Sequence, residues 1–222
     1  MFRIKVCGIT NVRDAVAAVD AGVDAIGLNF YEKSPRCVSI AEARRISDTV
    51  NLPAGPVGVF VNHDVEQIRE ICSQTNLHVI QAHGDESPEA LKPLAERDRV
   101  IWARRYGSDV KDVVGQLLRD VLNYATVVGH GPAALLIDAA VPGQYGGSGT
   151  TVSWDALAEY RSRLGDTPLI LAGGLTPDNV AEAIRIVRPH GVDVASGVES
   201  SPGKKDPVKV RDFIAAARAA FG

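Results

Sequence analysis

The sequence has 222 residues, of which 45% are hydrophobic and 23% charged, and its formal net charge is −3. These values describe an ordinary globular chain with enough apolar material for a sizeable core, and the absence of any dense basic run argues against nucleic-acid binding. Three scattered cysteines are too few for a disulfide framework, which favours a reducing compartment. The N-terminus reads as a strand rather than a signal segment, and no run is as apolar and long as a membrane span. We therefore expect a cytoplasmic protein.

Strand and helix patterns alternate along the whole chain. The expected strands are Ile4–Cys7, Ala25–Phe30, Val57–Val61, Val79–Ala82, Val100–Ala103, Ala133–Ile137, Leu169–Ala172 and Val192–Ala195. The expected helices are Val12–Ala21, Ile40–Thr49, Val65–Thr75, Pro88–Glu96, Val110–Leu122, Trp154–Leu164, Asp178–Val187 and Pro207–Ala220. Short, fully apolar strands between helices are typical of a parallel sheet covered by helices.

Eight such units without a long polar linker predict an α/β fold, a (β/α)8 TIM barrel that forms a single domain over residues 1–222. A doubly wound open sheet is the alternative, but no Gly-x-Gly-x-x-Gly follows the first expected strand.

Two glycine turns follow the seventh and eighth expected strands. After Gly173 and Gly174, Thr176 is suited to cap a helix and Pro177 to occupy its first position. Glycine lets the backbone approach a ligand closely, and the free N–H groups of a helix start attract an anion.

The eighth strand repeats this arrangement, because Ser196 and Gly197 precede a short helix expected to begin at Val198. Barrel enzymes commonly bind phosphate after strands seven and eight. The two turns together predict a phosphate site there, although each alone is equally compatible with an ordinary strand-to-helix connection.

Polar and reactive residues gather at the expected carboxyl ends of the strands, where barrel enzymes place their functional groups. Cys7 ends the first strand, Arg36 follows the second, His83 follows the fourth and Asp138 follows the sixth. This concentration at one face favours an enzyme.

Seven segments in register make the chain resemble a known family. They are Lys5-Val-Cys-Gly-Ile-Thr10, Phe30-Tyr-Glu-Lys-Ser-Pro-Arg36, Val57-Gly-Val-Phe-Val-Asn62, Gln81-Ala-His-Gly84, Tyr145-Gly-Gly-Ser-Gly149, Ala172-Gly-Gly-Leu175 and Ser196-Gly-Val-Glu-Ser-Ser-Pro-Gly-Lys-Lys-Asp206. The chain resembles phosphoribosylanthranilate isomerase of tryptophan biosynthesis from about residue 3 to residue 214. The resemblance implies conversion of N-(5-phosphoribosyl)anthranilate to the 1-deoxyribulose 5-phosphate derivative, an Amadori rearrangement that uses no cofactor.

The resemblance also assigns roles to three residues. Cys7 stands where the family has its general base, Asp138 matches the general acid, and Arg36 meets the anthranilate carboxylate. A planar guanidinium suits that contact because it offers two parallel hydrogen bonds. An ordinary thiol has a pKa of about 8.5, so we expect either a lowered pKa at Cys7 or a thiolate formed in the complex.

Three further features are less decided. His83 either touches substrate or ties the strand-four loop by hydrogen bonds, and the structural role is slightly favoured. No histidine pair has metal-ligand spacing, so no metal is expected. The glycine-rich segment 142–149 reads better as a lid over substrate than as a nucleotide-binding loop or a disordered connector.

Lys5 lies two residues before Cys7, so both side chains point into the barrel. A buried ammonium needs a partner. Because strand eight neighbours strand one when the barrel closes, we expect Lys5 to pair with Asp193, although another inward polar group remains possible.

Some positions depart from the family pattern. Asn29 replaces an apolar residue, Ala82 a leucine, Thr150 a lysine and Ser153 an aspartate. The segment 102–132 also looks a few residues longer than usual. These departures leave the acid, the base and the phosphate glycines in place, but they leave room for altered substrate fit.

Other functions remain open at this stage. A ribulose-phosphate epimerase would call for metal-site histidines, and a histidine-pathway isomerase for two phosphate grips with paired aspartates; neither pattern is found. A non-catalytic metabolite-binding barrel predicts loss of the acid and base, whereas Cys7 and Asp138 are both present. We expect a small phosphorylated substrate, no nucleic-acid or membrane partner, and a monomer or homodimer.

Overall fold

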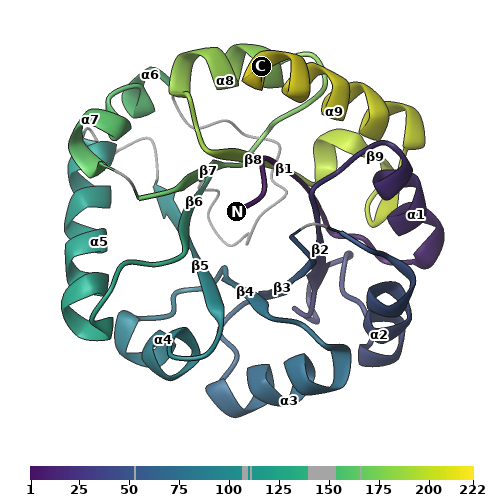
Figure 1. The fold of residues 1–222 in the computed structure, drawn as a ribbon, viewed down its shortest axis with the longest axis horizontal. Helices are drawn as coiled ribbons and strands as arrows, with labels where there is room; N and C mark the ends of the chain where they lie inside the picture. Colours follow the sequence, from purple (N-terminus) through teal and green to yellow (C-terminus); the bar gives the residue numbers. More distant parts are fainter. Residues whose placement is uncertain (53, 107–109, 111, 140–153, 166) are drawn as a thin grey trace.

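In the computed structural model, which describes residues 1–222 apart from 53, 107–109, 111, 140–153 and 166, eight parallel strands close into a barrel in the order β1 to β8 (Figure 1). These strands are β1 Ile4–Cys7, β2 Ala25–Asn29, β3 Pro56–Phe60, β4 Val79–Ala82, β5 Arg99–Tyr106, β6 Ala134–Ala139, β7 Leu169–Leu171 and β8 Gly191–Val194. The predicted (β/α)8 barrel is confirmed.

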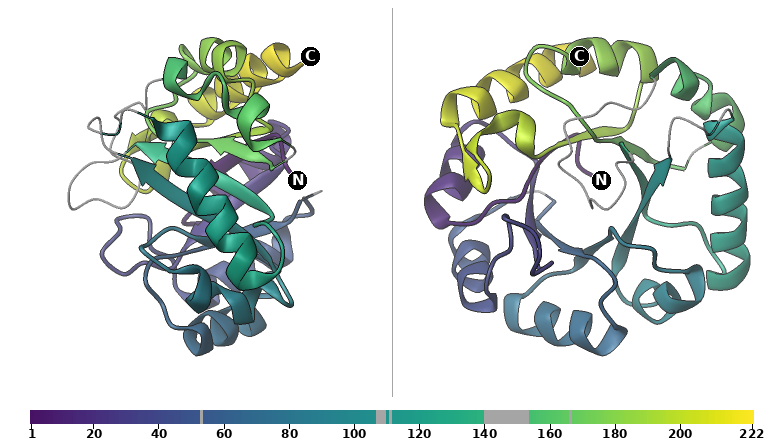
Figure 2. Two further views of the ribbon diagram at one scale, coloured as in Figure 1. Left: turned by 90° about the vertical axis from the view of Figure 1, so that its left-hand side faces the viewer. Right: turned by 180° about the vertical axis from the view of Figure 1, so that it is seen from behind.

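Helices surround the barrel on its outer side, as the two further views show (Figure 2). They are α1 Val12–Asp20, α2 Ile40–Thr49, α3 Val65–Thr75, α4 Pro88–Ala95, α5 Val113–Val128, α6 Trp154–Leu157, α7 Tyr160–Leu164, α8 Val180–Val187 and α9 Pro207–Phe221. Most begin where a side chain can satisfy a free N–H. Ser39, Ser87 and Asp206 each cap the helix that follows, and Asp64 and Gln67 form a capping box at α3.

The strand register separates an apolar end of the barrel interior from a polar one. Strand β1 closes the barrel against β8, with Lys5 opposite Asp193. An apolar cluster fills the inside of the barrel, mostly toward the amino ends of the strands, although Ala172 follows the carboxyl end of β7. It consists of Phe2, Ala25, Val57, Val79, Ile101, Ala103, Ala134, Leu136, Ile170 and Ala172. A larger apolar cluster fills the space between strands and helices. Polar inward side chains are thereby left for the carboxyl ends of the strands.

Four sequence expectations need correction. The helix expected at 154–164 is broken into α6 and α7 by a turn at residues 158–159. The helix expected at 110–122 starts at Val113 and runs to Val128. Strand β5 is also longer than expected and runs from Arg99 to Tyr106.

The other two corrections concern the glycine turns. Helix α8 begins at Val180 rather than Asp178. The helix expected from Val198 is instead a single 3-10 turn, η1 Ser196–Val198. An unexpected antiparallel hairpin of β9 Glu199–Ser201 and β10 Lys204–Lys205 follows it.

Candidate functional site

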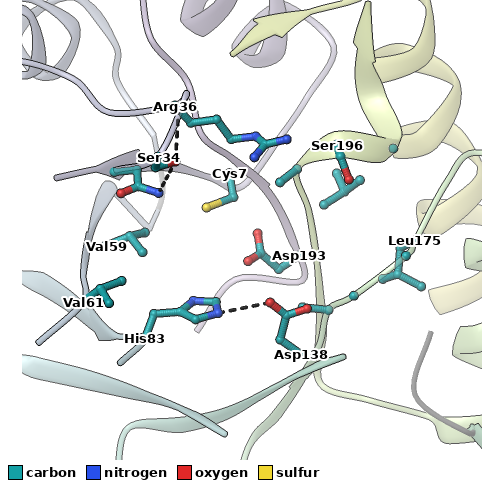
Figure 3. Close-up of a pocket in the computed structure, with 17 residues that line it drawn as sticks. Cys7, Ser34, Arg36, Val59, Val61, His83, Asp138, Leu175, Asp193 and Ser196 are labelled. Carbon is teal, nitrogen blue, oxygen red and sulfur yellow. Dashed lines mark hydrogen bonds and ion pairs between the residues drawn. The ribbon is translucent and has the colours of Figure 1, made fainter. Parts of the chain in front are cut away.

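A hollow opens at the carboxyl ends of the strands, with about 630 Å³ of space that includes the part open to solvent (Figure 3). Every residue selected from the sequence lines it: Cys7, Arg36, His83, Asp138, Gly173, Gly174, Ser196 and Gly197. These residues come from turns and strand ends far apart in the chain, and barrel closure brings them together.

Cys7 is the last residue of β1 and is nearly buried in the wall of this hollow. Burial raises the pKa of its thiol above the ordinary value, and the nearby Lys5 ammonium acts in the opposite direction without outweighing it. The expectation of a lowered pKa is therefore wrong for the free protein. The other route, a thiolate formed in the complex, stays open.

Lys5 and Asp193 pair as expected across the β1–β8 closure. The Nζ atom of Lys5 lies 2.9 Å from Oδ2 of Asp193, and their side chains are 0% and 6% exposed. Such a pair satisfies two charges that would each be costly to bury alone. Asp193 also lines the hollow together with Cys7, so this ion pair forms part of the wall of the hollow.

Asp138 projects from β6 and is held by His83. The distance from His83 Nε2 to Asp138 Oδ2 is 3.1 Å (Figure 3). On the other side of the ring, the amide nitrogen of Gln81 lies 2.6 Å from Nδ1. The ring of His83 therefore lies between Gln81 and Asp138, with one ring nitrogen within hydrogen-bond distance of each. His83 thus holds the Asp138 carboxyl, a contact that differs from both the substrate contact and the loop-tying role considered from the sequence.

Arg36 reaches the hollow from the turn after β2, but it is already engaged by an acidic side chain. Its Nε and Nη2 atoms donate to the two carboxylate oxygens of Glu199, both at 2.8 Å. This two-point contact occupies one edge of the guanidinium. The remaining edge, Nη1 and Nη2, is the part suited to a second carboxylate.

The glycine turns differ from the expected helix starts. Gly173 and Gly174 have φ values of 81° and 64°, which favour glycine. Thr176 does not cap α8; instead its N–H donates to Oδ1 of Asn179 at 2.8 Å, and Nδ2 of Asn179 donates to the Gly174 carbonyl at 3.0 Å. Asn179 therefore folds back to hold the turn, which moves the helix start to Val180.

At the other turn, a side chain on Gly197 would overlap the carbonyl oxygen of Leu175. Only glycine lets these two turns pack directly on each other. An anion in this corner would meet loop N–H groups rather than two helix ends.

Asn29, one of the departures from the family pattern, organises the turn that carries Arg36. Its Oδ1 accepts from the N–H of Tyr31 at 2.8 Å, and its Nδ2 donates to the hydroxyl of Ser34 at 3.3 Å. The same hydroxyl accepts from the N–H of Arg36 at 3.2 Å. Ala82 is fully buried in β4. The segment expected to form a lid, together with Thr150 and Ser153, lies outside the described residues.

Comparison with known proteins decides the family. The family model described as N-(5'-phosphoribosyl)anthranilate (PRA) isomerase matches residues 4–216. An N-(5'-phosphoribosyl)anthranilate isomerase of Myxococcus xanthus is 48% identical over 218 residues, which cover 97% of this chain and 96% of that protein. This chain belongs to the N-(5'-phosphoribosyl)anthranilate isomerase family.

Solved structures of the isomerase family show the same fold. A phosphoribosyl anthranilate isomerase in complex with reduced 1-(o-carboxyphenylamino)-1-deoxyribulose 5-phosphate has a TM-score of 0.80 and 38% identity, over 99% of this chain and 100% of that one. A structure described as monomers of the dimeric Thermotoga maritima isomerase has a TM-score of 0.80 and 37% identity, over 99% and 100% of the two chains.

Within this isomerase-family site, sequence reasoning missed Gln81, Glu199 and Lys205. All three lie inside segments that carry the family resemblance. Gln81 could have been predicted, because it lies two positions before His83 and alternate residues of a strand point to the same face. Glu199 and Lys205 could not, because the hairpin that holds them was not expected.

The described part of the chain contains neither a group of metal-ligating side chains nor a helix suited to span a membrane. No group of three or more His, Cys, Asp or Glu side chains there could hold a metal ion. Among the same residues, no helix has the length and apolar character needed to cross a membrane.

Proposed function

We propose that this protein isomerises N-(5-phosphoribosyl)anthranilate to 1-(2-carboxyphenylamino)-1-deoxyribulose 5-phosphate, the Amadori step of tryptophan biosynthesis. The observation that carries this proposal is that Cys7, on β1, and Asp138, on β6, line one hollow that Arg36 and two glycine turns also line. Membership of the isomerase family supports the reaction class. The arrangement supports assigning an acid, a base and two anion contacts.

Asp138 is the general acid in this proposal. It transfers a proton to the ring oxygen of the ribose as the bond between that oxygen and C1 breaks. The electron pair of the anthranilate nitrogen forms the C1–N double bond, which gives a protonated Schiff base. The hydrogen bond from His83 holds the carboxyl while its proton moves.

Cys7 is the general base. As a thiolate it takes the proton from C2, whose electron pair forms the C1–C2 double bond and returns the C1–N pair to nitrogen. The enol at C2 then becomes a ketone as C1 gains a proton, so no atoms are lost overall. Burial disfavours the thiolate in the free protein, and the adjacent cationic Schiff base would stabilise it when it is needed.

Two different parts of the hollow bind the two anionic groups of the substrate. The free edge of Arg36 binds the ring carboxylate, and the N–H groups around Gly173, Gly174, Ser196 and Gly197 bind the phosphate. A loop of free N–H groups binds phosphate without any positively charged side chain.

At the level of the whole chain, we propose a single domain over residues 1–222 that works in the cytoplasm as a monomer or homodimer, with no metal or cofactor. The continuous ring of strands supports the single domain. The dimeric relative from Thermotoga maritima supports the dimer as one alternative.

The test is a direct assay with freshly generated phosphoribosylanthranilate in the presence of a chelator. Purified protein should produce the deoxyribulose derivative, resolved from substrate by chromatography, at a rate proportional to protein concentration. Substrate that only hydrolyses to anthranilate, whatever the protein concentration, would overturn the proposal.

A further inference from the structure

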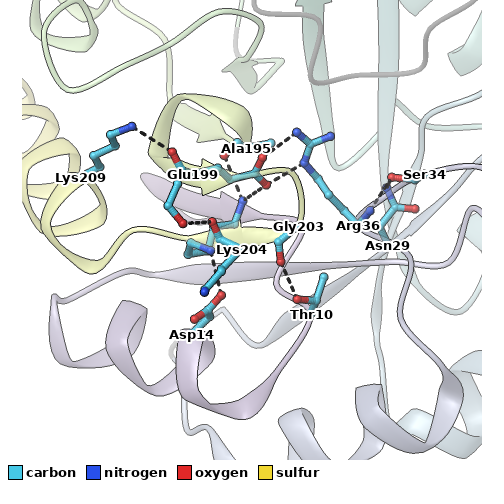
Figure 4. A network of polar contacts seen from close by, with 12 residues as sticks. Thr10, Asp14, Asn29, Ser34, Arg36, Ala195, Glu199, Gly203, Lys204 and Lys209 are labelled. Atoms are coloured by element: carbon cyan, nitrogen blue, oxygen red, sulfur yellow. Dashed lines mark hydrogen bonds and ion pairs between the residues drawn. The ribbon is translucent and has the colours of Figure 1, made fainter.

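Arg36, which lines the hollow, forms a charged cluster with Glu199 and Lys205. Figure 4 shows the polar network around Arg36 and Glu199. Besides the two contacts from Arg36, Oε1 of Glu199 accepts from Nζ of Lys205 at 2.9 Å. Nζ of Lys205 also donates to the carbonyl of Ala195 at 3.0 Å. Glu199 and Lys205 are only 7% and 5% exposed, so neither side chain faces solvent. Removing three charged groups from water costs free energy, and the ion pairs and hydrogen bonds within the cluster offset part of that cost.

The hairpin β9–β10 is fixed where it can hold this cluster. The carbonyl of Gly203 accepts from the Thr10 hydroxyl at 2.7 Å, and the N–H of Lys205 donates to Asp14 at 2.9 Å. Nζ of Lys209 donates to the backbone carbonyl of Glu199 at 2.9 Å. The hairpin backbone that carries Glu199 is therefore held from α1, from α9 and from the loop after β1.

The cluster contains two basic side chains and one acidic side chain. Burial lowers the pKa of Lys205, and the nearby Glu199 carboxylate acts against that shift. If Glu199 were the only partner of Arg36, the two charges would cancel and Arg36 would no longer attract an anion. Lys205 adds a second basic group to the cluster and so offsets the charge of Glu199. Burial alone would raise the pKa of Glu199, but its hydrogen bonds from Arg36 and Lys205 outweigh burial and hold the pKa below the ordinary value. The lowered pKa favours the charged carboxylate of Glu199, which accepts both hydrogen bonds from the Arg36 guanidinium.

We infer that Glu199 and Lys205 are positioning residues that hold Arg36 with one edge toward the hollow and keep the cluster cationic, so that the site selects a substrate bearing a carboxylate on its aromatic ring. Glu199 fixes the direction of the guanidinium and Lys205 preserves its charge. This inference rests on the role proposed above for Arg36. It predicts that both hairpin residues affect recognition of the ring carboxylate more than binding of the phosphate.

The test uses two ligands that differ only in that carboxylate. One is the reduced product analogue with the 2-carboxyphenylamino group, and the other is its counterpart made from aniline, which keeps the phosphate. The ratio of their dissociation constants, measured by calorimetry, reports carboxylate recognition alone. A general loosening of the site would weaken both ligands and leave the ratio unchanged.

In the Glu199→Gln and Lys205→Met variants, this ratio should fall at least tenfold, while the aniline analogue binds within about twofold of wild type. Lys204→Met, an exposed neighbour on the same hairpin, should keep the wild-type ratio. A wild-type ratio in both hairpin variants would overturn the inference, and so would an equal loss of both ligands by folded variants.

If a single variant fails to fold because it leaves a buried charge unpaired, the double variant Glu199→Gln/Lys205→Gln removes both charges together. It should fold and should still lose the ratio, and an unchanged ratio would overturn the inference. Equal binding of the two analogues by the wild-type protein would instead contradict the proposed role of Arg36, and this inference with it.

Discussion

At the scale of single residues, the site depends on geometry that charge alone does not supply. Arg36 uses Nε and Nη2 to bind Glu199 and has one further edge for substrate. A lysine has a compact charge with no such planar edge, so it cannot make both contacts at once. The residue type therefore matters as much as its sign.

Arg36→Lys should lower kcat/KM roughly tenfold to a hundredfold, the range that follows from losing a charge-assisted hydrogen bond worth about 1.5–3 kcal/mol. The measurement is steady-state kinetics with phosphoribosylanthranilate. Arg45→Lys, on a side chain that is 72% exposed in α2, is the matched control and should be neutral. Wild-type kcat/KM in the Arg36 variant would show that this guanidinium does not bind the substrate carboxylate.

The thiol of Cys7 gives a second prediction at this scale. Burial disfavours its charged form, so the pKa is raised, and the thiolate accumulates only at alkaline pH in the free protein. In a Cys37→Ser/Cys72→Val background, the rate of alkylation by iodoacetamide should rise with pH and have its midpoint above about 8.5, the ordinary thiol value. A midpoint below that value would contradict the structure of the free site.

At the scale of elements, periodicity and apolar runs predicted the strands and most helices well, since a buried parallel strand between helices has few alternatives. The pairing of Lys5 with Asp193 followed from barrel closure alone. The contact of Arg36 with Glu199 did not, because it joins two loops separated by 163 positions, which no periodic pattern relates.

The hairpin and the helix breaks escaped prediction for local reasons. Strands β9 and β10 have three and two residues and are mostly polar, so they show no alternation. No Gly or Pro marks the turn between α6 and α7. Thr176 and Pro177 looked like a helix start, yet the side chain of Asn179 binds the backbone of the turn and delays α8.

The β7–α8 turn carries the prediction for this scale. Gly174 has a φ of 64°, so Gly174→Ala would strain or flip the backbone whose N–H groups are proposed to face phosphate. The variant should raise the inhibition constant of inorganic phosphate and the KM for substrate several-fold. Gly131→Ala is the control, because a Cβ there meets nothing within 4 Å. Unchanged inhibition by phosphate in the Gly174 variant would count against a phosphate site here.

At the scale of the whole molecule, stability at alkaline pH should fall because buried acids resist ionisation. Burial raises the pKa of Cys72, on α3, to about 12. Between about pH 8.5 and 12 the unfolded thiol loses its proton and the folded thiol keeps it, so the free energy of unfolding decreases as pH rises.

Urea denaturation at pH 7 and pH 10 checks this sign. Cys72→Val removes the thiol, so its loss of stability between the two pH values should be smaller than that of the wild-type protein. An equal loss would show that Cys72 ionises alike in both states. Tyr124, whose pKa burial also raises to about 12, should leave some loss in the variant.

We propose that the barrel holds an acid and a base at separate strand ends around one hollow, and the kcat of two variants tests this most directly. Cys7→Ala and Asp138→Asn should each lower kcat by about 10²–10⁴-fold, the usual contribution of a positioned acid or base, with melting temperatures close to wild type. The double variant should lose less than the product of the two losses if both groups act on one coupled proton path. Near-normal turnover by folded Cys7→Ala protein would contradict the account, because another residue at the mouth of the barrel would then have to be the base.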